Sequence, residues 1–257
     1  MNKKNERPLI FVTNDDGISA KGIHELIDFL SPLGDIICIA PDGPRSAQSM
    51  ALTITQPLRF TRHEDYKGAE MWSVNGTPVD CVKLGMHTRL PRRPDLLVAG
   101  INHGSNSSVN VLYSGTMGAV MEGCALGIPS VGFSLTSHDP DADFSGCRDA
   151  VERISRDTLE NGLPEGVCLN VNIPAGIVPV GTRLTRAARG SWSDEYARYT
   201  DPHGKDFFLL TGKFKNEEPD DKSTDEWVLS HGYVSVTPTK TDRTSDVCPG
   251  WLREKLS

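Results

Sequence analysis

Residues 9–17 read LIFVTNDDG, an apolar run that ends in Asn14-Asp15-Asp16-Gly17. A short apolar run that is closed by turn residues is typical of a buried strand in a parallel sheet. In open α/β sheets, ligands bind beyond the carboxyl ends of such strands. Two adjacent carboxylates repel each other there, and a divalent cation compensates that repulsion. The tetrapeptide also consists of turn formers, so taken alone it predicts either a metal site or a turn.

The composition limits the class of protein. The chain has 257 residues, 37% of them apolar, and a formal charge of -7. This acidic balance argues against a nucleic acid polymer as partner and leaves room for a small phosphorylated ligand. The N-terminal residues lack a signal-like apolar segment, and no apolar run is long enough to cross a membrane. The six cysteines form no CxxC motif and are expected to be buried thiols. We expect a cytoplasmic globular protein with no membrane association.

Strand and helix patterns alternate along the first two thirds of the chain. Strands are expected at 9–13, 35–40, 96–101, 130–135 and 167–173, with extended segments at 51–60 and 71–74. Helices are expected at 20–31, from Thr77 onward, at 116–126 and at 146–160. Thr77-Pro78-Val79-Asp80 has the residues of a helix start, with Thr as N-cap and an acid three residues later. The alternation predicts an α/β fold with a mainly parallel, doubly wound sheet.

The last third of the chain has a different pattern. Short alternating runs between residues 183 and 240 predict β-hairpins, residues 216–225 an acidic solvated turn, and residues near 246–255 a short helix. We expect one domain, 1–257, with a core at about 8–182 and a β-rich extension and tail at about 183–257. Large aromatic residues are frequent in the extension, as they are at subunit interfaces: Trp192, Tyr196, Tyr199, Phe207, Phe208, Phe214 and Trp227. The extension is therefore predicted to build a homodimer or homotetramer.

Several common enzyme motifs are absent from the sequence. It has no GxGxxG after the first strand, no GxxxxGK[ST] and no GxSxG. His24-Glu25-Leu26-Ile27-Asp28 resembles HExxH but ends in Asp, on a segment that already has an apolar helical face. A phosphoaspartyl enzyme of the Asp-x-Asp type would need an acid two residues after Asp15, where Gly17 stands. These absences disfavour dinucleotide, P-loop, serine hydrolase and zinc chemistry.

Oxygen-bearing side chains follow three of the expected strands. Besides Asp15 and Asp16, Ser46 follows the second strand and Asn102 closes the third. Because the carboxyl ends of parallel strands meet at one sheet edge, we expect these side chains to converge. Two carboxylates, a hydroxyl and an amide oxygen are suited to Mg²⁺ or Mn²⁺. The alternative for Ser46 and Asn102 individually is that they cap turns.

The loop that follows Asn102 predicts a phosphate site. Residues 102–116 are rich in Gly, Ser and Asn, and Ser114-Gly115-Thr116 opens a helix. Free N–H groups and the positive end of the dipole make a helix N-terminus a place for phosphate. A Ser or Thr at this position is also an ordinary N-cap, and one residue can serve both purposes. A metal site beside a phosphate cradle favours phosphoryl chemistry.

Motifs in order along nearly the whole chain resemble those of the SurE family of metal-dependent nucleoside monophosphate phosphatases. They are TNDDG at 13–17, APDGPRS at 40–46, GTPVDCV at 76–82, AGIN at 99–102, YSGT at 113–116, EGCALGIP at 122–129 and GYVSVTP at 232–238. The resemblance implies a Rossmann-like core with a β-hairpin extension and a C-terminal tail that join subunits. GTPVD is interpreted as a helix start.

The resemblance also implies roles for individual residues. It makes Asp15, Asp16, Ser46 and Asn102 the ligands of one divalent cation, Mg²⁺ or Mn²⁺, per subunit. Residues expected to line the phosphate pocket are Asn106, Ser114, Gly115 and Thr116. The family usually has Gly after the serine of the PRS motif, where Ala47 stands here; if that position needs a positive φ, Ala is strained. His103 and Ser107-Ser108 also replace commoner residues of the pocket loop.

The expected function is that of a metal-dependent 5′-nucleotidase. It would hydrolyse nucleoside 5′- or 3′-monophosphates, and short polyphosphate as a further substrate, with Asp15 and Asp16 as catalytic residues. The alternative is a non-catalytic, Mg²⁺-dependent nucleotide-binding or receiver-like module. A receiver would have an acceptor Asp at the end of its middle strand, whereas the third strand here ends in Gly100-Ile101-Asn102. This difference favours the enzyme.

Overall fold

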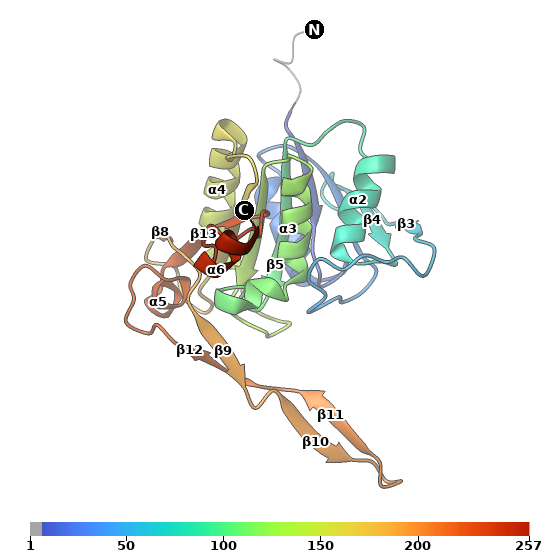
Figure 1. Ribbon diagram of the computed structural model, residues 1–257. Helices are drawn as coiled ribbons and strands as arrows, with labels where there is room; N and C mark the ends of the chain where they lie inside the picture. The colour runs from blue at the N-terminus through green and yellow to red at the C-terminus, as the bar shows by residue number, and fades with distance from the viewer. Residues whose placement is uncertain (1–6, 257) are drawn as a thin grey trace.

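A nine-stranded sheet forms the centre of the computed structural model, which describes residues 7–256 (Figure 1). Its strand order is β3-β4-β2-β1-β5-β6-β7-β13-β8. The bounds are β1 Leu9–Thr13, β2 Asp35–Pro41, β3 Phe60–Arg62, β4 Glu70–Val74, β5 Leu96–His103, β6 Ser130–Leu135, β7 Val167–Ile173, β8 Thr182–Leu184 and β13 Val234–Lys240. The strands from β4 to β7 are parallel to one another. The expected α/β class with a mainly parallel sheet is confirmed.

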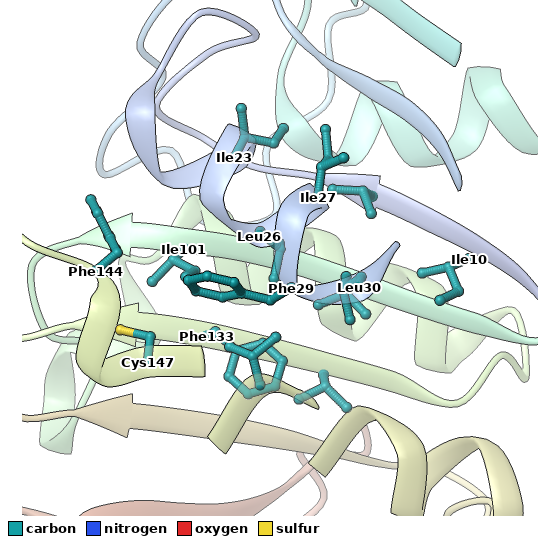
Figure 2. Packing of buried hydrophobic residues seen from close by; sticks show 14 of the residues in the cluster. Ile10, Ile23, Leu26, Ile27, Phe29, Leu30, Ile101, Phe133, Phe144 and Cys147 are labelled. Atoms are coloured by element: carbon teal, nitrogen blue, oxygen red, sulfur yellow. The ribbon is translucent and has the colours of Figure 1, made fainter. Parts of the chain in front are cut away.

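Helices cover both faces of the sheet. The longer helices are α1 Lys21–Leu30, α2 Pro78–Thr88, α3 Gly115–Ala125 and α4 Arg148–Asn161, with the 3₁₀ turns η1 Ser108–Leu112 and η2 Ser145–Cys147. One face packs against α1 and α4, and the other packs against α2 and α3. Figure 2 shows Leu26 and Phe29 of α1 beside Ile101 of β5 and Phe133 of β6, all of them buried. This burial confirms the predicted apolar face of residues 20–31.

The chain order places a crevice between β1 and β5. From β1 the chain runs outward through β2 to β4, and it then returns to pair β5 with the other side of β1. Such a reversal leaves the connections after the two central strands on opposite faces, which opens a crevice at their carboxyl ends. Asp15 and Asp16 follow β1, and Asn102 lies near the end of β5. The fold therefore brings these residues to its switch point.

The expected helix start at Thr77 is confirmed. The Thr77 side chain accepts a hydrogen bond from Asp80 N, and the Asp80 side chain accepts one from Thr77 N, which together form a capping box. The Asp80 carboxylate also accepts from Thr53 N at 3.1 Å. GTPVD therefore has the structural role expected of it. The expected extended segment at 51–60 is largely a loop, because β3 begins only at Phe60 and residues before it bond to side chains such as Asp80 rather than to a strand.

The C-terminal third contributes both to the sheet and to structure outside it. β13 pairs antiparallel with β7, and β8 pairs parallel with β13. The core sheet therefore includes residues beyond the expected limit of about 182, because the chain returns to the sheet edge after its excursion. Outside the sheet lie β9 Gly190–Ser193 with β12 Lys213–Asn216, β10 Tyr196–Thr200 with β11 Asp206–Leu210, α5 Asp225–Ser230 and α6 Gly250–Leu256. The hairpins and the terminal helix agree with the sequence-based expectation.

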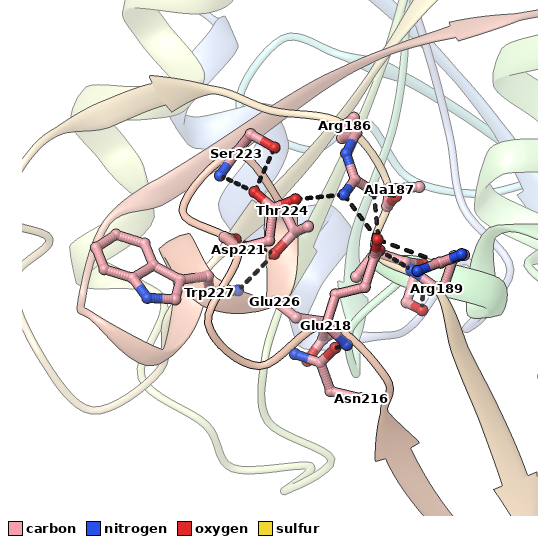
Figure 3. A network of polar contacts seen from close by, with 12 residues as sticks. Arg186, Ala187, Arg189, Asn216, Glu218, Asp221, Ser223, Thr224, Glu226 and Trp227 are labelled. Atoms are coloured by element: carbon pink, nitrogen blue, oxygen red, sulfur yellow. Dashed lines mark hydrogen bonds and ion pairs between the residues drawn. The ribbon is translucent and has the colours of Figure 1, made fainter.

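The acidic segment at 216–225 takes part in a network of hydrogen bonds and ion pairs, whereas the sequence predicts a solvated turn (Figure 3). Glu218 accepts two hydrogen bonds from the Arg186 guanidinium, both at 2.9 Å, and a third from Arg189 N at 2.7 Å. These bonds to Arg186, together with the one from Arg189 N, lower the pKa of Glu218 to about 2. Thr224 then caps α5 by accepting from Trp227 N. The network fixes the approach to α5, because it ties residues 216–224 to residues 186–189.

Composition led to expectations about membrane-spanning segments and about the cysteines. No helix within residues 7–256 is long and apolar enough to cross a membrane. All six thiols are free, and five of them are buried as expected, whereas Cys248 is exposed, so the expectation of burial is wrong for that residue. Burial raises the pKa of Cys147 and Cys168 to about 12, so these thiols stay protonated at neutral pH and behave as small apolar groups.

Candidate active site

Five of the predicted site residues line one cavity of about 370 Å³ at the carboxyl ends of β1, β2 and β5. They are Asp15, Ser46, Asn102, Asn106 and Ser114. The first three bring a carboxylate, a hydroxyl and an amide group together, and the other two belong to the expected phosphate pocket. Of the four side chains expected to converge at one sheet edge, the fold brings Asp15, Ser46 and Asn102 to the wall of this cavity.

Asp15 is a buried carboxylate with few compensating contacts. The residue is 5% exposed, and burial, with the Asp16 charge as a second cause, raises the pKa of its carboxyl to about 6. The Thr116 hydroxyl donates to Asp15 Oδ1 and opposes that rise. The backbone of Asp15 is held as well, because Arg45 N donates to its carbonyl oxygen at 2.7 Å. A raised pKa at a cavity wall indicates a carboxylate that lacks a cationic partner in the chain itself.

Asp16 lies beside the cavity rather than on its wall. It is half-buried, and its Oδ2 accepts a hydrogen bond from His103 N at 3.1 Å. Burial raises the pKa of Asp16, while the His103 backbone bond lowers it. The ring of His103 stacks on Phe144 with centroids 5.1 Å apart and lines the cavity. Asp16 therefore connects the end of β1 to the end of β5.

A backbone irregularity near the end of β5 positions Asn102. The register between β5 and β6 shifts between Ala99 and Asn102, and Gly100 has a φ of +129°. A Cβ at Gly100 would lie 2.3 Å from the carbonyl oxygen of Phe133, so only Gly fits there. Asn102 Nδ2 donates to Gly104 O at 2.7 Å. The bond to Gly104 orients the amide, and Oδ1 is its atom that can bind a cation.

The loop after β2 places Ser46 on the cavity wall. Ser46 is exposed, and the loop is tied to the opposite side of the site by Ser49 N, which donates to Tyr113 O at 3.0 Å. Ala47 has a φ of 59°. This position therefore does use the left-handed region, and Ala carries a strain there of roughly 1–2 kcal/mol that Gly would not. The departure from the usual Gly has a structural cost.

The start of α3 holds the Asp15 carboxylate. Ser114 caps the helix by accepting from Met117 N at 3.0 Å, and it also lines the cavity. A Cβ at Gly115 would lie 2.8 Å from the Cβ of Asp15, so the missing side chain lets the helix N-terminus approach this carboxylate. Thr116 is fully buried and is not on the cavity wall. The structure thus places the Thr116 hydroxyl against Asp15, where the sequence suggested a phosphate ligand.

Asn106 is held by a network of buried amides. Its Nδ2 donates to Ser134 Oγ at 2.9 Å, and its backbone N donates to Asn172 Oδ1 at 2.8 Å. Asn170 Nδ2 donates to the Asn106 carbonyl oxygen at 2.8 Å. Ser134 lies on β6 and both other asparagines lie on β7, and all of these residues are buried. The sheet interior therefore orients the predicted phosphate loop through polar contacts that sequence reasoning missed.

The region after residue 183 also takes part in the site. Asp225 of α5 accepts from Ser108 N at 2.8 Å and from Ala188 N at 2.9 Å, and Glu226 accepts from the Ser107 hydroxyl. Glu226 lines the cavity, as do the residues Trp192, Phe214 and His138. The sequence prediction groups Trp192 and Phe214 with the aromatic residues of subunit contacts. The structure places both of them on the cavity wall.

Among the described residues, no group of three or more His, Cys, Asp or Glu side chains is arranged to hold a metal ion. His24, which belongs to the HExxH-like segment, has other contacts: its ring nitrogen is hydrogen-bonded to Ala20 O, and its ring packs edge-on against Tyr66. A cation at the cavity would therefore have two carboxylates at most and would need neutral oxygens to complete its coordination. Ser46 Oγ and Asn102 Oδ1 are oxygens of that kind.

Comparison with known proteins agrees with this architecture. Residues 10–194 match the family model described as survival protein SurE. The chain is 51% identical to "5′-nucleotidase SurE" of Phocaeicola vulgatus, over 94% of each chain, and 50% identical to the protein of the same name in Bacteroides fragilis, over 94% and 95%. The crystal structure of the SurE protein from Aquifex aeolicus superimposes with a TM-score of 0.80 at 36% identity, covering 93% of this chain and 95% of that one. On these matches, the chain belongs to the SurE family.

Proposed function

We propose that this protein is a divalent-metal-dependent phosphomonoesterase that hydrolyses nucleoside 5′- or 3′-monophosphates to nucleoside and phosphate. The observation that carries the proposal is the single cavity that gathers Asp15, Ser46 and Asn102 beside the N-terminus of α3. The names of the relatives support a nucleotidase, since two curated proteins about half identical to this chain are called 5′-nucleotidase. Short polyphosphate is a further substrate class that the same site chemistry would accept.

The residues on the cavity wall, together with Asp16 beside it, fit one Mg²⁺ or Mn²⁺ per subunit. The pKa of Asp15 is raised to about 6 because its carboxylate is buried and lies next to that of Asp16. A bound cation would compensate both the burial of the charge and the repulsion between the two carboxylates. Asp15, Asp16, Ser46 and Asn102 would hold it, a set of hard oxygen ligands that suits these ions. When bound, the cation supplies Lewis-acid polarisation of the phosphoryl group and a more acidic attacking water.

The chain's own residues would bind and orient the phosphate. Ser114 and Asn106 both line the cavity. The Ser114 hydroxyl only accepts, from Met117 N, so its hydrogen remains for the phosphate, and the Asn106 amide has a second hydrogen beside the one it gives to Ser134. The N-terminus of α3 adds a positive dipole end next to the site. Thr116 acts through Asp15, which it holds in one orientation with its hydroxyl. Asp16, or Asp15 beside it, is the group that takes the proton of the attacking water.

Phosphate release from a panel of nucleotides tests the proposal. We expect turnover of 5′- and 3′-monophosphates with Mg²⁺ or Mn²⁺, none after chelation with EDTA, and recovery when the ion is restored. Tripolyphosphate in the same panel tests the further substrate class. Nucleotide binding without phosphate release in any ion would instead support the non-catalytic binding module. Turnover that survives complete chelation would contradict the metal requirement.

We further propose that the distal hairpin joins subunits into a homodimer or homotetramer. β10 and β11 extend away from the sheet (Figure 1), and the larger apolar side chains along them are exposed: Tyr196 68%, Tyr199 48%, Phe207 44%, Phe208 59%, Leu209 52% and Leu210 66%. The pairs Tyr196–Leu210 and Tyr199–Phe207 lie on opposite faces of the hairpin, because they differ by an odd number of positions. A two-stranded hairpin alone is only marginally stable in water. Packing of both faces against another subunit would stabilise it.

Light scattering tests the assembly at micromolar concentration. We expect a dimer or tetramer for the unaltered chain and a smaller species for a Tyr199→Ser, Phe207→Ser double variant, whose site residues are unchanged. Circular dichroism would confirm that the variant is folded. A monomeric unaltered chain would rule out the assembly role of this hairpin.

A further inference from the structure

An aromatic pair at the base of the long extension forms part of the active-site wall. Trp192 of β9 and Phe214 of β12 are cross-strand partners. Their rings meet edge-to-face, with centroids 5.7 Å apart and planes at 61°. Both side chains line the same cavity as Asp15, Asn106 and Ser114. The pair therefore stands apart from the aromatic residues of β10 and β11, which line no part of this cavity.

The indole of Trp192 is fixed in place although it remains accessible. Its Nε1 donates to Asn110 Oδ1 at 2.9 Å, which ties β9 to η1 of the pocket loop. Two glycines leave room for the rings: a Cβ at Gly212 would lie 2.9 Å from Trp192 Cε3, and one at Gly190 would lie 2.5 Å from Phe214 Cζ. Even so, 36% of Trp192 is exposed. A tethered ring that remains open to a cavity is suited to stack on a flat ligand.

The remaining lining groups indicate which part of a ligand meets this wall. The carboxylate of Asp15 and the polar groups of Asn106 and Ser114 serve the phosphate in the proposed reaction. A nucleotide carries, beyond its phosphate and ribose, a planar base that aromatic side chains recognise by stacking. The cavity volume of about 370 Å³ is within the usual range for small-molecule sites.

We propose that Trp192, supported edge-on by Phe214, stacks on the base of the substrate and makes the enzyme selective for nucleotides over phosphate esters without a base. Purines have the larger π-face, so they gain more from this contact than pyrimidines. The inference rests on the proposed function and assigns the substrate class of the same site. It gives the base of the extension a role in specificity in addition to any role in assembly.

The kinetic test compares substrates with and without a base. In Trp192→Ala, we expect the KM for AMP to rise by roughly 5- to 150-fold, the range that loss of one base–aromatic stack implies. The KM for ribose 5-phosphate should stay unchanged, and the KM for UMP should rise less than that for AMP. Trp192→Phe keeps an aromatic ring and should recover most of the loss. Trp251→Ala removes an exposed tryptophan of α6 away from the cavity and serves as the matched control.

Calorimetric binding of adenosine, which has a base and no phosphate, separates this inference from the proposed function. We expect adenosine to bind the unaltered protein and to bind Trp192→Ala more weakly by a similar factor. If the unaltered protein hydrolyses neither AMP nor ribose 5-phosphate, the proposed function is wrong. Adenosine binding then still decides whether the Trp192 indole contacts the base. Equal losses for AMP and ribose 5-phosphate, unchanged KM values for both, or adenosine binding that ignores Trp192 would each overturn the inference.

Discussion

Asp15→Asn should lower phosphatase turnover by at least 100-fold, even with saturating Mg²⁺ or Mn²⁺. The change removes a charged ligand from the proposed cation site. Mutation of a residue that only hydrogen-bonds to a metal ligand already lowers metal affinity or activity by typically 10- to 100-fold. Metal titration, followed by calorimetry, should show weaker binding of the ion by a comparable factor. The exposed carboxylate of Asp141 provides the matched control, because Asp141→Asn makes the same chemical change away from the cavity.

The same variant should be more stable than the unaltered protein once metal is chelated. Asp15 has a pKa of about 6 when folded against 3.8 as a free side chain. The folded state therefore holds the proton more tightly, and the stability of the metal-free protein falls as pH rises from about 4 through 6. Asp15→Asn removes that penalty, so urea unfolding at pH 8 should show a gain of about 1–3 kcal/mol. Full turnover by Asp15→Asn at ordinary metal concentrations would contradict the metal assignment, whatever its stability.

Local sequence patterns were sufficient to predict the centre of the sheet and the acids at its edge. β1 and β5 are apolar runs closed by turn residues, and the carboxyl ends of parallel strands meet at one edge. Asp15 and Asn102 could therefore be placed in one site before any contact was known. The capping box at Thr77 was predictable for a similar reason, because all its members lie within four residues of one another.

The missed contacts join segments that are far apart in the chain. Asp225 bonds to Ser108 across 117 positions, and Glu226 bonds to Ser107 across 119. No periodic pattern signals such a contact, and an acidic run next to a turn resembles a solvated loop. The return of β13 to the sheet edge was hidden in the same way, since it follows an excursion of about 50 residues through the hairpins. A segment rich in aromatic residues, such as the one that contains Trp192, has the same composition at a subunit interface as on the wall of a site, so composition alone does not separate the two.

Family resemblance and structure give Thr116 two different roles, which kinetics can separate. The resemblance implies a phosphate-lining hydroxyl, whereas the structure buries that hydroxyl completely and directs it to Asp15 Oδ1. Thr116→Val keeps the shape of the side chain and removes only the donor. On the structural arrangement, Asp15 loses the bond that fixes its orientation, and we expect metal affinity to fall by 10- to 100-fold.

A direct phosphate contact would give a different result. Loss of one donor to a charged phosphate costs roughly 1.5–3 kcal/mol of binding, so the KM for the nucleotide would rise even at saturating metal. We expect that KM to change little, while the metal concentration for half-maximal activity increases. Thr116→Ser restores a hydroxyl at the same position and should recover metal affinity, which a general packing defect would not allow. A lower melting temperature with both constants unchanged would reduce Thr116 to a structural residue of α3, because the kinetics would then be independent of its bond to Asp15.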